Sequence, residues 1–220
     1  MAAGRANRQG DGSNRLERRK QRTRGALIRA AQGFIAEGKT NVAVLEITQT
    51  ADVGMGSFYN HFSSKEELFA AAVNDVLDAH GALLDRLTES LDDPAEIFAC
   101  SFRLTGRLFR RRPQESRVLL AHGLPLLTCD RGLAPRVRRD ITAAANAGRF
   151  RVDDPTRAVA VAAGALLGLG QLLVDEPERD DALAADRVTE DVLRMFGMAA
   201  AEASEICRRP LPDLDGGEIS

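Results

Sequence analysis

Residues 44–69, VLEITQTADVGMGSFYNHFSSKEELF, constrain the fold more than any other stretch of the chain. Apolar residues at Val44, Ile47 and Ala51 follow the i, i+3, i+7 spacing of one helical face. After a short break, a second helical run covers residues 55–62, and another break follows it. Two short helices joined by a tight turn predict a helix-turn-helix arrangement.

A third helix is predicted directly after this pair, because SKEE at residues 64–67 has the pattern of a capping box. FYNHF at residues 58–62, followed by this helix start, resembles the DNA-binding signature of TetR-family transcriptional regulators. The close match covers residues 22–68, and beyond it the resemblance is one of length and helical content. The resemblance implies an all-α fold of about nine helices, with an N-terminal three-helix helix-turn-helix DNA-binding domain and a C-terminal helical ligand-binding and dimerisation domain.

Four segments are predicted along the chain. They are a disordered basic arm at residues 1–16, the DNA-binding domain at 17–64, the ligand-binding and dimerisation domain at 65–207, and a disordered tail at 208–220. The arm is rich in Gly, Asn and Arg and lacks an apolar period, which disfavours a packed structure. Its arginines either follow DNA phosphates, enter a minor groove, or only keep the chain in solution.

The charge of the chain is divided unevenly, although the net charge is only −2. Residues 1–65 contain eleven Lys and Arg against five Asp and Glu, a net charge of +6. Residues 66–220 contain nineteen against twenty-seven, a net charge of −8. A basic N-terminal part on an acidic body indicates that the N-terminal part, and not the body, meets a polyanion.

The resemblance implies DNA contacts from the start of the first helix, where Arg22 and Thr23 lie, and from the recognition helix. Asn60 is suited to adenine, and Met55 is suited to a thymine methyl group. Tyr59 and His61 are expected on phosphates, as their counterparts are in the family. Lys65 opposes the dipole of its helix, so a phosphate contact explains it better than a structural role. The predicted DNA-binding residues are Arg22, Thr23, Gly54, Met55, Gly56, Ser57, Tyr59, Asn60, His61 and Lys65.

Three positions depart from the family pattern. Ala43 stands where Ser or Thr usually caps the second helix, which costs about 1 kcal/mol of local stability. Asp52 stands where Gly usually forms the turn, so the turn must hold Asp in a left-handed backbone conformation. Gly54 replaces the Ser or Thr that usually caps the third helix and touches a phosphate, which leaves only backbone N–H groups for that contact.

The body is expected to hold a ligand cavity and a dimer interface. By resemblance, the cavity is framed by helices five to eight; Phe98, Phe102 and Leu166 are candidate apolar walls, and His122 and Gln171 are candidate polar groups. Helix eight, at about residues 155–174, is apolar nearly all round and needs cover on most faces. Pairing helices eight and nine (about 184–207) of two chains into a four-helix bundle would supply that cover.

These observations predict a homodimeric repressor that a small lipophilic inducer releases from a palindromic DNA operator. The alternative is an architectural protein that binds DNA with little sequence preference and has no inducer. The sequence has no glycine-rich phosphate loop, nucleophile elbow or metal-spaced set of His, Cys and Asp, so no enzyme activity, cofactor or metal is expected. Three widely spaced cysteines and a polar N-terminus predict free thiols, a cytoplasmic location and no membrane span.

Overall fold

The computed structural model describes residues 6–122 and 133–213, and this part of the chain contains ten helices and no strand. The prediction of an all-α fold is therefore confirmed. The chain divides into an N-terminal unit, Met1–Asp75, and a C-terminal unit, Val76–Ser220. The helices are α1 (Ala6–Ala36), α2 (Val44–Thr50), α3 (Met55–Tyr59), α4 (Lys65–Leu87), α5 (Pro94–Arg111), α6 (Pro113–His122), α7 (Leu133–Asn146), α8 (Pro155–Asp175), α9 (Asp181–Met195) and α10 (Ala200–Arg208).

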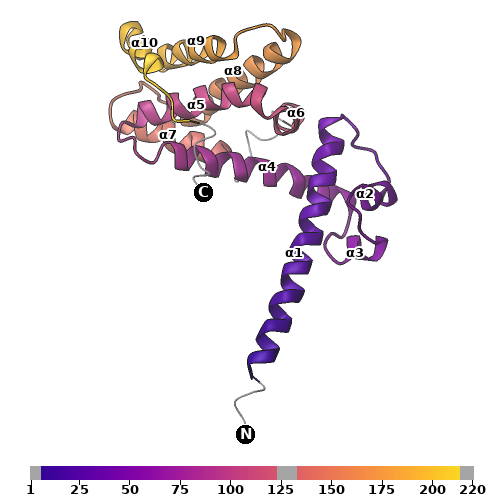
Figure 1. The fold of residues 1–220 in the computed structure, drawn as a ribbon. Coiled ribbons are helices and arrows are strands. Elements are labelled where there is room, and N and C mark those ends of the chain that lie inside the picture. Colours follow the sequence, from indigo (N-terminus) through magenta and orange to yellow (C-terminus); the bar gives the residue numbers. More distant parts are fainter. Residues whose placement is uncertain (1–5, 123–132, 214–220) are drawn as a thin grey trace. The chain divides into compact units, whose positions relative to one another are not determined.

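The N-terminal unit is built from α1, α2, α3 and the first part of α4 (Figure 1). Its core contains one fully buried side chain or more from each helix, among them Leu27, Ile47, Phe58 and Leu68. Because Leu68 and Ala72 of α4 are also fully buried, the boundary between the units falls inside α4 rather than before Lys65.

Helix α1 begins at Ala6, so residues 6–16, expected above to belong to a disordered arm, are helical in the structure. Residues 1–5 lie outside the described part of the chain. An apolar period marks the face by which a helix packs, and Leu16 of this segment is 59% exposed. Residues 14–16 are exposed, and a helical segment with exposed side chains leaves no such period in the sequence.

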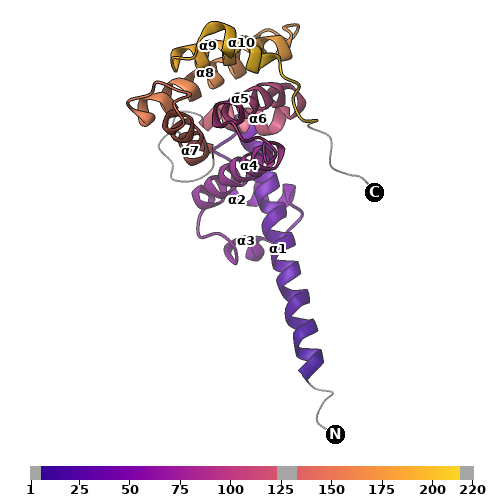
Figure 2. The same cartoon turned by 90° about the vertical axis from the view of Figure 1, so that its left-hand side faces the viewer.

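In the C-terminal unit α5 occupies the centre, packed against α6, α7, α8, α9 and α10. Helices α9 and α10 lie on one side of it, and the second part of α4 lies on the other (Figures 1 and 2). The aromatic rings of Phe98, Phe150 and Phe196 meet in the core, with ring centroids 5.2–5.6 Å apart. This core holds the helices in position around the cavity described below.

The single ninth helix predicted at residues 184–207 is two helices, α9 and α10. Asp180 caps α9 by accepting a hydrogen bond from the backbone N–H of Leu183. Gly197 ends it with φ +87°, a left-handed conformation that Gly adopts without strain. Residues 123–132, between α6 and α7, lie outside the described part of the chain.

Candidate DNA interface and body cavity

The helix-turn-helix contains the three unusual local features predicted from the sequence. Ala43 precedes α2 with extended backbone and makes no side-chain cap. Asp52 has φ +54° and is the one residue other than Gly with a positive φ in the described residues. Gly54 precedes α3, again without a side-chain cap. The turn is therefore formed without the residues that would stabilise it most.

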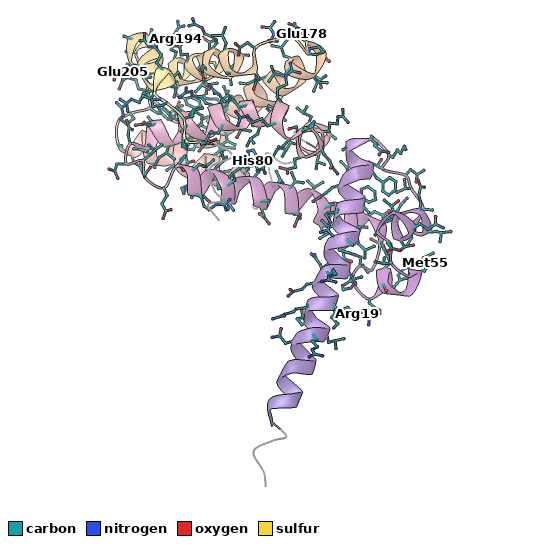
Figure 3. All side chains as sticks on the ribbon, in the orientation of Figure 1. Arg19, Met55, His80, Glu178, Arg194 and Glu205 are labelled. Atoms are coloured by element: carbon teal, nitrogen blue, oxygen red, sulfur yellow. The ribbon has the colours of Figure 1, made fainter. Side chains whose placement is uncertain are left out.

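Helix α3 has a buried side and an exposed side. Phe58 is fully buried, with its ring edge-to-face against Tyr59 at 5.1 Å and tilted against Phe62 at 6.1 Å. Tyr59 and Met55 are 62% and 42% exposed, and Met55 projects outward in Figure 3. Asn60 is also exposed. This short helix thus presents a side that can approach a partner, although it ends at Tyr59 and not at Phe62 as expected.

The remaining predicted DNA-binding residues all belong to the N-terminal unit. Gly56 is exposed, and Ser57 and His61 are half-buried. On α1, Arg22 is exposed and Thr23 is half-buried. All five of these residues are at least partly exposed, so a DNA duplex can reach them.

The start of α4 is tied to the residues before it. The backbone N–H of Glu67 donates to the Ser64 hydroxyl at 3.1 Å, as in a capping box. The Glu67 carboxylate accepts from the backbone N–H and the hydroxyl of Ser63, which holds the pKa of Glu67 below its usual value. Lys65 Nζ donates to Asn41 Oδ1 at 3.0 Å, so Lys65 does have a structural partner, contrary to expectation. Because the side-chain amide of Asn41 is neutral, it does not compensate the positive charge of Lys65.

A cavity of about 100 Å³ lies inside the C-terminal unit, with walls from α4 to α8. Phe98, Phe102 and Leu166 line it, as the sequence predicted. Gln171 does not: it is exposed and donates to Asp175 Oδ1 at 2.9 Å. Five residues along a helix rotate a side chain by about 140°, so Gln171 and Leu166 of α8 face different directions. The side chain of His122 lies outside the described residues.

Three polar residues that the sequence reading missed also line the cavity: Ser101 and Thr105 of α5 and Asp140 of α7. Burial raises the pKa of Asp140, against the opposing effect of Arg139, whose Nε donates to Asp140 Oδ1 at 2.9 Å. One face of α7 has the i, i+3, i+4, i+7 spacing of Val137, Asp140, Ile141 and Ala144, and Asp140 is the only polar residue of these four. That exception is a signal from which it could have been found.

A buried histidine adjoins one of these polar residues. His80, labelled on α4 in Figure 3, is buried. Its side chain is 2% exposed, and its Nε2 lies 2.9 Å from Thr105 Oγ1. Thr105 Oγ1 also donates to the carbonyl oxygen of Ser101 at 2.8 Å. Because a hydroxyl has one proton, Nε2 of His80 is then the donor in the first bond. Burial, together with the charge of Arg112, lowers the pKa of His80 to about 4, so the ring is neutral.

Family models match both units of the chain. Residues 27–72 match the bacterial regulatory proteins of the tetR family, and residues 93–209 match the tetracyclin repressor-like C-terminal domain. The chain belongs to the TetR family. TetR-family proteins are DNA-binding transcriptional regulators and not a class of enzymes, so this TetR-family chain is a transcriptional regulator.

Solved structures and characterised regulators agree with this assignment. RolR in complex with its ligand resorcinol is 34% identical, with 90% of this chain and 98% of RolR covered and a TM-score of 0.63. RolR without ligand is 36% identical, with 86% and 98% covered and a TM-score of 0.70. TcmR of Streptomyces glaucescens is 30% identical over 94 residues, 42% of this chain and 41% of TcmR. TtgR of Pseudomonas putida is 29% identical over 104 residues, 47% and 49% respectively, so the chain spans less than half of either regulator.

Other classes of site receive little support from the described residues. They contain no group of three His, Cys, Asp or Glu side chains that could hold a metal ion. Cys100 and Cys207 are buried free thiols, and burial raises the pKa of Cys100 to about 11 and that of Cys207 to about 12. Cys129 lies outside the described residues. Helix α8 alone among the described helices is long and apolar enough to cross a membrane, which is weak evidence because core helices of other proteins pass the same test.

Proposed function

We propose that this TetR-family protein is a homodimeric repressor that leaves its operator when a small hydroxylated aromatic compound enters the body cavity. The observation that carries this proposal is the pairing of an exposed recognition helix with a mostly apolar cavity in the other unit. A regulator of this kind works at the chromosome, so its proposed location is the cytoplasm. The proposal has three parts: the dimer, the DNA contacts and the ligand.

An uncovered apolar surface on α8 and α9 supports the dimer. Gly164 and Gly168 of α8 are exposed, and a methyl group at either position would meet nothing within 4 Å. Val174 of α8, Leu183 of α9 and Met195 at its end are more than half exposed. Small residues allow two helices to approach closely, so α8 and α9 of two chains can form a four-helix bundle. A two-fold dimer then presents its recognition helices to half-sites roughly 34–36 Å apart.

The exposed side of α3 supports direct contact with DNA. Asn60 is suited to a bidentate contact with adenine in the major groove, and Met55 to a thymine methyl group. Tyr59, His61 and Lys65 are suited to phosphates, which they can reach without reading the sequence. Gly56 allows close approach of the backbone to the duplex. In this assignment α3, the residues directly after it and the start of α4 together position the protein and select the site.

The size and lining of the cavity support a ligand with one aromatic ring. A cavity of about 150 Å³ lined by Leu, Ile and Phe is known to bind benzene, so a cavity of about 100 Å³ is on the scale of one aromatic ring rather than of several. The rings of Phe98, Phe102 and Phe109 can pack on it. Ligand hydroxyl groups can donate to the Asp140 carboxylate and bond to the Ser101 hydroxyl. Resorcinol, the ligand of RolR, has this chemistry.

Helix α4 offers a physical connection between the ligand and the DNA contacts. Leu77 and Leu84 of α4 line the cavity, and the same continuous helix begins at Lys65 in the N-terminal unit. A ligand releases DNA only if it binds the DNA-incompetent conformation more tightly than the competent one. We infer that the ligand achieves this by displacing the α4 side chains of the cavity wall.

Calorimetry with resorcinol and benzene tests the ligand class. Resorcinol is expected to bind more tightly than benzene, because only resorcinol can donate to Asp140. Asp140→Asn should weaken resorcinol by about ten- to a hundredfold and leave benzene nearly unchanged, because a charge-assisted hydrogen bond contributes about 1.5–3 kcal/mol. Asp78→Asn, an exposed change on α4, is the matched control. Equal affinity for both compounds would refute the assignment of Asp140.

Selection of duplexes from a random library by the full-length protein tests the regulator. A near-palindromic consensus is expected, bound by two protomers and released by resorcinol at concentrations that occupy the cavity. Sedimentation without DNA should give a dimer. A protein that bound random and selected duplexes equally, with a steep salt dependence and no release by any ligand, would instead be a sequence-tolerant architectural protein.

A further inference from the structure

The first part of α1 carries a row of arginines outside the packed core. Residues 14–22, NRLERRKQR, contain five basic side chains and one acidic side chain, Glu17. Four of the basic residues follow the i, i+3, i+4, i+7 spacing of one helical side. These four, named here the basic stripe, are Arg15, Arg18, Arg19 and Arg22.

Residues 14–22 of α1 are not stabilised by packing against the core. Leu16, its one large apolar residue, is 59% exposed, whereas Leu27, which follows the end of the stripe, is fully buried. Figures 1 and 2 show α1 continuing well past α2 and α3, and Figure 3 labels Arg19 on this projecting part. Like charges three and four residues apart disfavour a helix by about 0.2–0.5 kcal/mol per pair. A polyanion along the stripe would remove this repulsion.

The stripe is also available for such a partner. Arg18, Arg19 and Arg22 are exposed, and none of these three forms an ion pair or hydrogen bond with another side chain among the described residues. Other cations of the same unit are engaged: Lys39 Nζ lies 2.8 Å from Glu37 Oε2, and Lys65 Nζ bonds to Asn41. These three arginines therefore concentrate uncompensated positive charge on the unit that carries the recognition helix.

We propose that Arg15, Arg18 and Arg19 of the basic stripe form a second DNA contact, which binds phosphates of the duplex beyond the half-site contact to which Arg22 belongs. This inference rests on the proposed function, because it takes the same DNA as partner. The helical form favours phosphates over the minor groove, since a helix is about 10–12 Å across and that groove is only about 6 Å wide. From Arg15 to Arg22 the stripe runs about 10 Å, the rise of about three base pairs. The contact adds affinity on any flanking sequence and no specificity.

Salt titration of a selected duplex tests the proposal with a triple variant, Arg15→Gln, Arg18→Gln and Arg19→Gln. Arg22 is left unchanged because it already belongs to the proposed half-site contact. Three phosphates per protomer are six per dimer, so the slope of log K against log salt should become shallower by about 5. Lysine at the same three positions keeps the charge and should keep the wild-type slope. The matched control is glutamine at three exposed arginines of the C-terminal unit, Arg86, Arg117 and Arg138, and it should also keep the slope.

Trimming the selected duplex from both ends in two-base-pair steps locates the contact. Wild-type affinity should fall as the flanks are removed, whereas the glutamine variant should not respond until the half-sites are reached. A variant with the wild-type slope and the wild-type trimming curve overturns the proposal, although the selected site still supports the repressor. A variant that is equally impaired on long and fully trimmed duplexes overturns it too, because the arginines then act within the half-site or on the fold. If no defined sequence is selected, the failure is that of the proposed function.

Discussion

In the N-terminal unit the residues assigned to DNA lie on the outside of a small core, whereas in the C-terminal unit the residues assigned to the ligand face inward. The DNA set is compact along the chain: most of it falls between Gly54 and Lys65. The cavity lining extends from Leu77 to Leu167 and comes from five helices. A duplex must be met by an exposed, locally constructed surface, and a small apolar molecule must be enclosed by distant segments. We therefore expect that a substitution can impair DNA binding without impairing ligand binding, and the reverse.

Among the variants, Phe58→Ala is expected to separate DNA binding from ligand binding most strongly. Phe58 is fully buried in the N-terminal unit, and its removal should cost about 3–5 kcal/mol. DNA binding should be lost, while calorimetry should show resorcinol binding close to wild type, because the cavity is lined by residues of the other unit alone. Hydrogen exchange should show faster opening of α2 and α3 only. Loss of ligand binding together with DNA binding would break the comparison between the units.

A change of pH should act first on the C-terminal unit, through His80. Its pKa is about 4 in the folded protein against 6.5 in a solvated chain, so below pH 6.5 the unfolded chain takes up a proton that the folded chain excludes. The contribution of His80 to stability is therefore complete above pH 6.5 and is lost as the pH falls towards 4. The total loss is about 3 kcal/mol.

Urea unfolding of the wild type and of His80→Gln, measured between pH 7 and pH 4, tests this linkage. Gln cannot take up a proton and can still hydrogen-bond to Thr105, so the variant should lose less stability over this range. Carboxylates that titrate near pH 4 are common to both proteins and cancel in the difference. Parallel curves for the two proteins would contradict the buried, neutral state of His80.

Within the N-terminal unit, Tyr59 and Asn60 are neighbours with different predicted roles. Tyr59→Ala should weaken binding to every duplex alike, because a phosphate contact carries no sequence information. Asn60→Ala should remove the preference at one base pair, with a loss of about 1–3 kcal/mol on the selected site. Titration against the selected duplex and its single-base variants measures both. Relaxed preference in the Tyr59 variant and uniform weakening in the Asn60 variant would reverse the assignments.

The same contrast explains how much the sequence revealed. The helix-turn-helix, its buried Phe58 and its strained Asp52 are encoded within residues 44–62, where motif spacing and backbone preference suffice. The start of α4 at Lys65 was predicted for the same reason. In the body, Phe98, Phe102 and Leu166 were identified as apolar, but the polar side of the cavity was assigned to Gln171 instead of Asp140. The packing of α5, α7 and α8 decides which polar residue faces the cavity. In the sequence this shows only as one polar residue, Asp140, among apolar residues of the same helical face.

Two helix boundaries were also missed for physical reasons. Residues 14–20 of α1 are exposed, so no apolar period marks this part of the helix. The break between α9 and α10 depends on Gly197, whose left-handed φ is one of several conformations open to Gly. A methyl group there would approach Arg151 Cβ to 2.9 Å, so the break is fixed by packing as well as by backbone.

The smallest expected effect is a gain in stability from Asp52→Gly. Asp52 holds φ +54° in the turn between α2 and α3, and a left-handed conformation costs a residue other than Gly about 1–2 kcal/mol. Part of this gain is offset because Gly increases the conformational entropy of the unfolded chain, so a net gain of about 1 kcal/mol is expected. Asp52→Ala is the matched control: it keeps the strained conformation and loses the side chain that tolerates it, so it should give no gain. Urea unfolding of the two variants, with resorcinol affinity as the measure of the other unit, checks both. Equal stability of the Gly and Ala variants would mean that the turn relaxes elsewhere and that the strain is not held at this residue.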